Sequence, residues 1–576
     1  MDIPRPEYPR PDFVREDWLS LNGEWEFEFD DGDKGMAERW FDRPALSRRI
    51  NVPFTFESRL SGIGDTSVHE VVWYRRTFRI PDAYRGRRIQ LNFGAVDYAA
   101  TVWVNGEYVG EHRGGYTPFS FDITESLRAL NTVVIRAEDR LCKEQPRGKQ
   151  YWEPKSAGCH YTRATGIWQS VWLEPVSVFH FTHVRFYPDV DTSRVKAIVG
   201  LSGLNDTMEI KARFTFNNEL QAETRLRPAG DDTAFDTWLN DARLWSVEQP
   251  NLYNVMLELC EGGKVYDRVL AYFGMRKVSI DNGRVLLNNQ PCHLRFVLDQ
   301  GYFPDGIYTA PTDDAFRRDI ELTKSLGFNG VRKHQKVEDP RYFYWCDKLG
   351  LLVWGEMGNC YCFNDTSMTN LAAEWPRVVR ANFNHPSIIT WVPFNESWGI
   401  EGIQDMDRPQ EFVGQIVAFT REIDPTRPVV DNSGWSHVDT DIVDLHEYSQ
   451  DAGLVHRILS EISPTNPVLP LNTHKIPSIA SGFRYLGQPV VVSEYGGIAL
   501  ASETRDGAWG YGESAQTIAK LTDRYRDLTE SIIGNAFIAG FCYTQLYDIE
   551  QEVNGLLTYN RRPKIDVETI AAINRK

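Results

Sequence analysis

The sequence has no long hydrophobic run and no block of basic residues. A membrane-spanning helix needs about 20 consecutive apolar residues, and the N-terminal stretch also lacks the apolar core of a secretory signal. Its 63 Lys and Arg residues are outnumbered by 80 Asp and Glu residues, which gives a net charge of −17. Because nucleic-acid binding depends on clustered cations, the sequence predicts neither a membrane protein nor a nucleic-acid-binding protein.

Cysteine is also sparse. The eight cysteines among 576 residues are scattered, and a chain of this length does not need a disulfide framework to fold. The closest pair, Cys360 and Cys362, lacks the CxxC spacing and the second pair that a zinc site needs. These absences predict reduced thiols in a cytoplasmic protein, with no metal site and no cofactor.

Aromatic residues, in contrast, are abundant. The 17 Trp, 25 Tyr and 30 Phe residues make up 12% of the chain. β-Sheets favour aromatic side chains, and flat rings also stack on the faces of sugars, so composition leaves both explanations open. Since a single core stops growing near about 250–300 residues, the chain must contain several domains.

Two all-β regions come first. Residues 1–176 contain short alternating strands such as Val71–Ile80 and Ala100–Val104, and the second of these runs into the hairpin signal Asn105-Gly106. This pattern predicts an N-terminal β-sandwich of the jelly-roll type. Residues 177–277 form a second strand-rich stretch of about 100 residues, a length that suits an immunoglobulin-like β-sandwich.

From residue 278 to 576 the pattern changes to strands that alternate with helices. Expected helices include Thr312–Leu326, Pro340–Leu349 and Ala515–Ile533. Eight apolar runs predict buried parallel strands: Cys292–Leu298, Gly330–Lys333, Leu351–Trp354, Ile388–Pro393, Pro428–Asp431, Ile442–Leu445, Pro489–Val492 and Ile538–Tyr543. This order favours a (β/α)₈ TIM barrel. A doubly wound open sheet is the alternative, but the first strand is not followed by a Gly-rich phosphate-binding turn.

Two of these strands end in glutamate. Glu396 follows the fourth strand and Glu494 the seventh, and the carboxyl ends of barrel strands form the active site in enzymes of this fold. Strands four and seven approach the barrel axis from opposite sides, so we expect the two carboxylates to face each other. Such a pair can hydrolyse a glycosidic bond. Asn395, directly before Glu396, can hydrogen-bond a sugar 2-hydroxyl.

Several motifs resemble glycoside hydrolase family 2. The resemblance covers about residues 15 to 565 in the expected order and rests on these segments: Leu21–Phe27, Gly94–Tyr98, Val102–Gly106, Gly114–Phe119, Thr165–Trp168, Phe273–Lys277, Asn329–Arg332, Asn395-Glu396 and Ser493–Gly496. It implies a retaining exo-β-glycosidase in which Glu396 is the general acid/base and Glu494 the nucleophile. The two carboxyl groups of a retaining pair stand about 5–5.5 Å apart.

The resemblance also implies roles for residues around this pair. Arg332 would lie beside Glu494 and keep it ionised by its charge, and Tyr448 would hydrogen-bond the same carboxylate. His446, two residues before Tyr448, is a candidate for substrate binding. Family members often form homodimers or tetramers, but the sequence specifies no interface.

The sequence departs from the family where the sugar is held. The glucuronidase branch carries an Asn-x-Lys pair near the eighth strand. In the matching stretch of this chain Asn554 is present, but no lysine follows it. Asp299 is by position a candidate to bind a sugar hydroxyl, and Lys333 or Lys336 could bind a uronic carboxylate. Tyr543 stands where the family usually has Trp.

Four tryptophans, Trp354, Trp398, Trp435 and Trp509, are candidate walls of the sugar site, and we expect one or two of them to touch sugar. With a carbohydrate as substrate, β-galactosidase is the leading activity. The alternatives within the family are β-galacturonidase, β-glucuronidase and furanosidases. A non-catalytic carbohydrate-binding protein is the alternative of a different class, and the presence of both glutamates argues against it.

Overall fold

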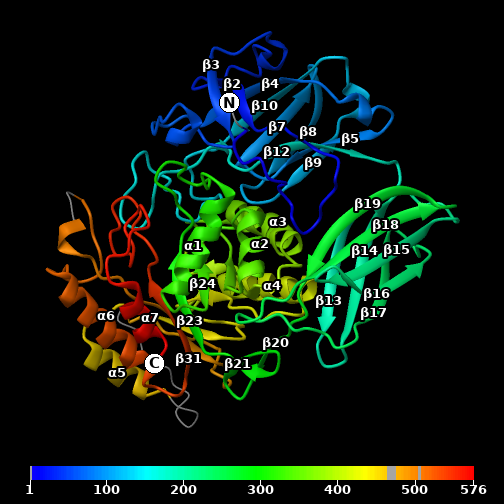
Figure 1. Cartoon of the computed structure of the whole chain (residues 1–576). Helices are drawn as coiled ribbons and strands as arrows, with labels where there is room; N and C mark the ends of the chain where they lie inside the picture. Colours follow the sequence, from blue (N-terminus) through cyan, green and yellow to red (C-terminus); the bar gives the residue numbers. More distant parts are fainter. Residues whose placement is uncertain (1–2, 463–474, 504–506) are drawn as a thin grey trace.

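The computed structural model describes residues 3–462, 475–503 and 507–576. Figure 1 shows three bodies: the first sandwich, in blue and cyan, lies above the barrel, and the second sandwich lies at the barrel's side. The barrel occupies the rest of the picture, from green to red. This arrangement of a jelly-roll-like sandwich, an immunoglobulin-like sandwich and a TIM barrel confirms the predicted fold class.

The first sandwich consists of a four-stranded sheet in the order β1-β12-β5-β9 and a six-stranded sheet in the order β3-β2-β4-β10-β7-β8, with β6 and β11 as a separate pair. Its strands are β1 (Leu19–Ser20), β2 (Gly23–Phe29), β3 (Arg48–Val52), β4 (Val71–Phe78), β5 (Arg88–Phe93), β6 (Val96–Asp97), β7 (Ala99–Val104), β8 (Glu107–Arg113), β9 (Phe119–Asp122), β10 (Asn131–Glu138), β11 (Gly166–Ile167) and β12 (Val171–Val176).

Aromatic side chains fill the space between these sheets. Phe27 packs against Tyr74 and Phe29 with ring centroids 5.1 Å apart in each pair, and Trp25 packs edge-on to Tyr74. Trp25, Phe27 and Tyr74 are all fully buried. Much of the aromatic content of the sequence therefore serves the sandwich core, because large rings fit a half-buried pleated surface.

The second sandwich pairs a three-stranded sheet, β13-β14-β17, with a four-stranded sheet, β16-β15-β18-β19. Alternate residues of β17 are buried and exposed, as expected of a strand with one wet face. Its strands are β13 (His180–Asp189), β14 (Arg194–Ser202), β15 (Glu209–Phe216), β16 (Glu219–Leu226), β17 (Asp232–Trp238), β18 (Tyr253–Glu261) and β19 (Lys264–Phe273). We propose domain boundaries after Val176 and near Lys277, between these strands and their neighbours.

A small sheet of β20 (Val278–Asp281), β21 (Arg284–Leu287) and β22 (Gln290–Pro291) precedes the barrel. The barrel elements follow: β23 (Leu294–Asp299), α1 (Asp313–Ser325), β24 (Gly330–Lys333), α2 (Pro340–Leu349), β25 (Leu352–Glu356), α3 (Asp365–Ala381), β26 (Ile388–Val392), β27 (Phe394–Asn395), α4 (Asp407–Ile423), β28 (Asn432–Ser433), β29 (Val443–Glu447), α5 (Ala452–Ser460), β30 (Val490–Gly496), α6 (Ile518–Ile533), β31 (Ile538–Thr544) and α7 (Val567–Asn574).

Parallel pairing runs around most of the barrel. Seven strands follow one another in the order β26-β25-β24-β23-β31-β30-β29, and β27 and β28 form a separate parallel pair. The fifth strand is shorter than the predicted Pro428–Asp431, because only Val429 forms a bridge there and the paired residues of β28 come after it. No helix in the described ranges is both long enough and apolar enough to span a bilayer.

Local capping sets where the helices begin. The side chain of Thr312 accepts a hydrogen bond from the backbone N–H of Ala315, so α1 begins one residue later than predicted. Thr517 caps α6 in the same way through Lys520, which moves its start from the predicted Ala515 to Ile518.

A long segment of the first sandwich, residues 139–165 between β10 and β11, leaves the sandwich and contacts the barrel. The backbone N–H groups of Arg147 and Gly148 donate to the carbonyl of Asn359, at 2.9 and 3.2 Å. The Tyr161 hydroxyl donates to Glu552 at 2.5 Å, farther along the same barrel end. This segment, here called the insertion segment, therefore lies at the carboxyl ends of the barrel strands.

Candidate active site

The two predicted glutamates meet at the carboxyl end of the barrel. Glu396 comes directly after β27 and Glu494 lies within β30. An oxygen of Glu396, an oxygen of Glu494 and a ring nitrogen of His446 all lie within 4.8 Å of one another. We call the region around these three residues the barrel mouth.

The backbone at Glu396 is in an unfavourable conformation. Glu396 and Ser397 have φ angles of 53° and 59°, in the left-handed region that non-glycine residues avoid. Two hydrogen bonds hold them there: the Glu396 N–H donates to Ser433 at 2.9 Å, and the Ser397 N–H donates to the Asn432 side chain at 2.8 Å. Such local strain persists only where the surroundings enforce it, and it often occurs at functional sites.

Arg332, at the end of β24, connects the groups of the mouth and is fully buried. It donates to Glu356 at 2.6 Å and to Glu494 at 3.0 Å, and it also contacts the Asn395 side-chain oxygen at 3.0 Å. The two carboxylates outweigh the cost of burying its charge and raise the pKa of Arg332. The guanidinium is therefore a fixed cation beside Glu494.

Glu494 has a second donor on its other oxygen. The Tyr448 hydroxyl donates to Oε2 of Glu494 at 2.6 Å and lies 3.0 Å from the hydroxyl of Thr544. The Tyr448 ring is stacked on Tyr511, with centroids 3.6 Å apart and planes 8° apart. With Arg332 on Oε1 and Tyr448 on Oε2, the carboxylate plane of Glu494 is fixed.

His446 lies between the two glutamates. Its Nδ1 is 2.8 Å from Oε1 of Glu396, and its Nε2 is 3.2 Å from an N–H of Arg332 and 3.4 Å from Glu494. Because Arg332 donates to Nε2, the tautomer with the proton on Nδ1 is favoured, and this proton is donated to Glu396. Burial alone would raise the pKa of Glu396, but this hydrogen bond and the charge of Lys149 lower it to about 2.

A third buried glutamate supports the first two. Glu356, at the end of β25, accepts from Arg332 and also from the ring of His334 at 2.8 Å. These partners outweigh the effect of burial and lower the pKa of Glu356 to about 2. His334, two residues after Arg332, therefore also belongs to this cluster.

The insertion segment contributes side chains that the sequence did not point to. Trp152 packs against Tyr361 with ring centroids 4.2 Å apart, and His160 packs against both at 4.8 and 5.0 Å. Lys149 is 9% exposed, and its charge acts on Glu494 and on Glu396. No local motif marks these residues, because their role depends on how the first sandwich docks on the barrel.

Three predicted tryptophans lie near the mouth. Trp398 is 37% exposed and its indole N–H points to Oε2 of Glu396 at 3.4 Å. Trp509 is partly exposed, packs against Tyr511 at 5.3 Å and donates to the Gly158 carbonyl of the insertion segment at 2.8 Å. Trp435 is half-buried, and its carbonyl accepts from Asn432, whose side chain also holds Ser397.

Other predicted residues are engaged elsewhere. Asp299 is 1% exposed; it pairs with Lys333 at 2.9 Å and accepts from Tyr547 at 2.5 Å, and these partners lower its pKa to about 2 against the effect of burial. Lys333 and Lys336 both contact Glu338 at 3.0 Å, and Lys336 also donates to two backbone carbonyls. This network occupies the groups that were expected to hold the sugar.

The structure does not bring Tyr543 and Trp354 to the mouth. Tyr543 packs against Tyr495 and against Tyr525 of α6, at 5.4 and 4.9 Å, so it lies on the helix side of its strand. Side chains alternate along a strand, and the neighbouring Thr544 is the one that reaches Tyr448. Trp354 is 1% exposed and belongs to the core inside the barrel.

Glu396, His446 and Glu494 also have the residue types of a metal site. However, the guanidinium of Arg332 lies 3.0 Å from Glu494 and 3.2 Å from the ring nitrogen of His446 that would face an ion. A second cation would be repelled there. The chemistry of the donor set therefore does not fit a metal ion.

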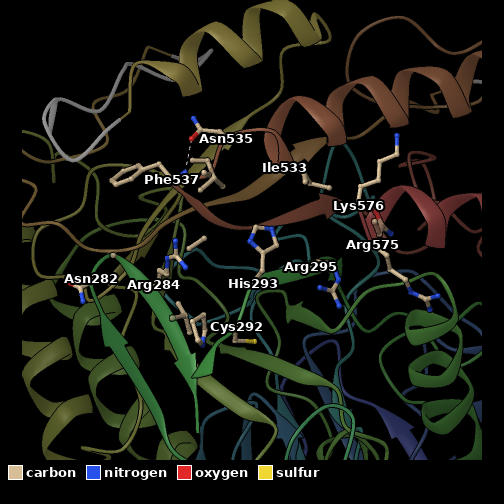
Figure 2. A pocket seen from close by; sticks show the side chains of 17 residues that line it. Asn282, Arg284, Cys292, His293, Arg295, Ile533, Asn535, Phe537, Arg575 and Lys576 are labelled. Atoms are coloured by element: carbon tan, nitrogen blue, oxygen red, sulfur yellow. Dashed lines mark hydrogen bonds between the residues drawn. The ribbon is translucent and has the colours of Figure 1, made fainter. Parts of the chain in front are cut away.

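The opposite end of the barrel contains a cavity of about 530 Å³. Figure 2 shows basic side chains around it, from the start of β23, the β20–β21 turn and the chain after α7. Its charged or titratable lining residues are Arg284, Cys292, His293, Arg295, Arg575 and Lys576. No acidic residue lines it within the described ranges, so it offers no acid/base pair.

Comparison with known families covers nearly the whole chain. The model described as "Glycosyl hydrolases family 2, sugar binding domain" matches residues 18–173. The model "Glycosyl hydrolases family 2" matches residues 179–276. The model "Glycosyl hydrolases family 2, TIM barrel domain" matches residues 278–570, which is half of the chain.

Individual relatives differ in activity and length. A β-glucuronidase of Paenibacillus borealis is 25% identical over 97% of this chain and 96% of its own length. A β-galactosidase of Thermoanaerobacter pseudethanolicus is 28% identical over 62% of this chain, and this chain spans only 48% of that relative. The solved structure of Ruminococcus gnavus β-glucuronidase has a TM-score of 0.80 and 19% identity, and all of this chain and 99% of that one are covered.

Proposed function

This chain belongs to glycoside hydrolase family 2, and we propose that it is an exo-acting β-glycosidase that retains anomeric configuration. In this proposal Glu494 attacks the anomeric carbon and Glu396 protonates the departing oxygen. Water then hydrolyses the glycosyl-enzyme, with Glu396 as the base. The two half-reactions are a double displacement.

The separation of the two carboxyl groups carries this proposal. Oxygens of Glu396 and Glu494 approach within 4.8 Å. Retaining glycosidases hold their carboxyl groups about 5–5.5 Å apart, whereas inverting enzymes keep about 6.5–9.5 Å so that a water fits between. The short separation favours direct attack by Glu494.

The partners of Glu494 suit a nucleophile. It must be ionised to attack, and the guanidinium of Arg332 donates to its Oε1 at 3.0 Å. The hydrogen bond from Tyr448 orients the other oxygen. Because Arg332 occupies Oδ1 of Asn395, the amide nitrogen is the group that Asn395 offers to a sugar 2-hydroxyl.

The partners of Glu396 suit an acid/base whose two oxygens do different work. His446 holds Oε1, while Oε2 is directed to Trp398, the most exposed aromatic ring of the mouth. Oε2 is therefore the oxygen that exchanges a proton with the leaving group. Glu396 is ionised in the free protein; a bound glycoside excludes water and so favours the protonated carboxyl.

Covalent trapping tests the mechanism. A 2-deoxy-2-fluoro glycosyl fluoride should label Glu494, and mass spectrometry of the digested protein should find the adduct on the peptide that contains it. The Glu494→Gln variant is the control and should remain unlabelled and inactive while folding normally. Labelling at another residue, or inversion of configuration in the product by NMR, would refute the assignment.

The sugar itself is the finer question. The sequence favoured β-galactosidase, whereas a relative that matches this chain over 97% of its length is named a β-glucuronidase. The expected uronate ligands, Lys333 and Lys336, are engaged in the network with Glu338. The choice between a neutral sugar and a uronic acid therefore depends on other cations of the mouth.

A further inference from the structure

Lys149 is a lysine of the first sandwich that lies at the barrel mouth. We propose that Lys149 binds the carboxylate of a terminal uronic acid, so that the first sandwich determines the substrate class of the barrel. This inference rests on the proposed glycosidase activity. It assigns the recognition of charge to a segment outside the barrel, where the sequence showed no motif for it.

The backbone around Lys149 is firmly attached to the barrel. The N–H groups of Arg147 and Gly148 both donate to Asn359, and the Tyr361 hydroxyl donates to the Gly148 carbonyl at 2.6 Å. Gly148 has a φ of 60°, and a Cβ built there would lie 2.0 Å from the carbonyl oxygen of Gln335. Only glycine allows this approach, so the position of Lys149 is fixed relative to the strand ends.

The side chain of Lys149 is a buried charge. Burial would lower its pKa, but Cys159, Tyr361, Glu552 and Glu494 outweigh this effect and raise it, so the amine stays protonated. Among the described residues, no carboxylate oxygen lies within 4 Å of its nitrogen. A buried ammonium is costly without a counter-ion at contact distance, and a carboxylate of the substrate would supply one.

Three cations of the barrel strand ends, Arg332, Lys333 and Lys336, already have carboxylate partners. Arg332 is bound to Glu356 and Glu494, Lys333 is paired with Asp299, and Lys336 is paired with Glu338. Burial and the charge of Lys149 lower the pKa of His160 to about 3, so this ring is neutral at physiological pH. Among the described residues, Lys149 is thus a buried cation of the mouth that is in no ion pair and is available to an anionic sugar.

The pairing would discriminate between sugars. A uronic acid and its neutral counterpart differ only at C6, where a carboxylate replaces a hydroxymethyl group. A site that is built to pair a charged group rejects a ligand without that group, because its own charge is left unpaired. We therefore expect the wild type to hydrolyse aryl β-glucuronides or β-galacturonides at least about 100-fold faster, in kcat/KM, than the matching glucosides or galactosides.

Substitution of Lys149 tests the proposal on the full-length protein. Lys149→Met should lower kcat/KM for the preferred uronide about 100-fold or more and should lower that for the neutral glycoside by a much smaller factor, because only the uronide loses its counter-ion. Lys149→Arg should recover part of the uronide activity. Lys155→Met is the matched control, because Lys155 is an exposed lysine of the same segment; it should leave both rates unchanged.

Two results would overturn the proposal. One is a wild type that prefers neutral glycosides. The other is an equal loss on both substrates in Lys149→Met that is restored in the double variant Lys149→Met/Glu552→Gln, because Lys149 would then only balance the buried charge of Glu552. Failure of the glycosidase activity itself would look different: the wild type would hydrolyse neither substrate and Glu494 would not be labelled.

Discussion

The two ends of the barrel differ in how their charges are arranged. At the mouth, Glu356, Glu396 and Glu494 converge on Arg332 and His446 within hydrogen-bonding distances. At the opposite end, the 530 Å³ cavity of Figure 2 is lined by basic groups that include Arg295 and Arg575. The mouth thus combines both signs of charge, whereas the residues that line the cavity at the other end carry one.

This difference matters because hydrolysis needs an acid and a base at fixed positions. Partners shift the pKa values of Glu356 and Glu396 to about 2 at the mouth, whereas at the other end burial lowers the pKa values of His293 and Arg295 without a carboxylate to pair them. A hollow alone therefore does not identify an active site. Ionisable groups that face each other and shift each other's pKa values are better evidence of an active site.

The largest expected effect tests the proposed acid role at the mouth. Glu396→Gln should lower kcat/KM for glycosides with poor leaving groups, such as methyl glycosides, by about 10³-fold or more. A 2,4-dinitrophenyl glycoside should lose far less in the release of its phenol, because that leaving group departs without a proton. Stopped-flow measurement of the first turnover separates this step from deglycosylation. An equal loss of kcat/KM for all leaving groups would refute the assignment of Glu396 as the general acid.

The next effect tests whether the mouth depends on the first sandwich. Gly148→Ala should lower kcat/KM about 10²-fold, because a Cβ would collide with the carbonyl of Gln335 and displace the insertion segment. Gly158→Ala is the matched control: Gly158 lies in the same segment and has a φ of 57°, but a Cβ there meets nothing within 4 Å. We expect it to stay within about 3-fold of the wild type in the same assay.

A stability measurement compares the charges of the two ends directly. The pKa of Glu356 is lowered from 4.5 to about 2, so its ionisation stabilises the fold above pH 4.5 and this contribution is lost as the pH falls toward 2. The shift corresponds to about 3 kcal/mol. Glu356→Gln should therefore unfold at lower urea concentration at pH 7 and show a flatter dependence of stability on pH below pH 5.

The control for this measurement is an exposed carboxyl near the other end. Glu248→Gln removes a surface charge whose field reaches Arg295, and surface charges contribute at most about 1 kcal/mol. If both variants lost the same free energy of unfolding at pH 7, the partners of Glu356 would stabilise the fold no more than the surroundings of an exposed carboxylate do.

The sequence predicted the parts of this comparison that depend on local pattern. Buried strands that end in Glu396 and Glu494 placed both carboxylates at one barrel end, because carboxyl ends of parallel strands meet there. Tyr543 occupies the family position in sequence, but side chains alternate along a strand and its ring packs against Tyr525 of α6. Asp299, Lys333 and Lys336 have the positions expected of a sugar site. However, Lys333 is paired with Asp299 and Lys336 with Glu338, so these charges are already neutralised.

Residues of the insertion segment lay beyond what the sequence could predict. Lys149 is more than 300 residues from Glu494 in the chain, and its place at the mouth depends on the contacts of Arg147 and Gly148 with the barrel. Docking between domains leaves no periodic signal in either segment. A positive φ at Gly148 is the one local requirement, and glycine occurs at many other turns of this chain.

The smallest expected effect concerns the end opposite the mouth. Arg295→Gln combined with Arg575→Gln should leave kcat/KM within about 2-fold of the wild type, because these side chains line the cavity at the start of β23 and after α7 and touch no group of the mouth. The variant should also be no less stable at low salt, since one arginine raises the cost of charging the other. Steady-state kinetics checks the first point, and urea unfolding at low and high ionic strength checks the second. A loss of kcat/KM above about 10-fold would mean that the basic end of the barrel also contributes to catalysis. The two ends would then not differ in function as argued above.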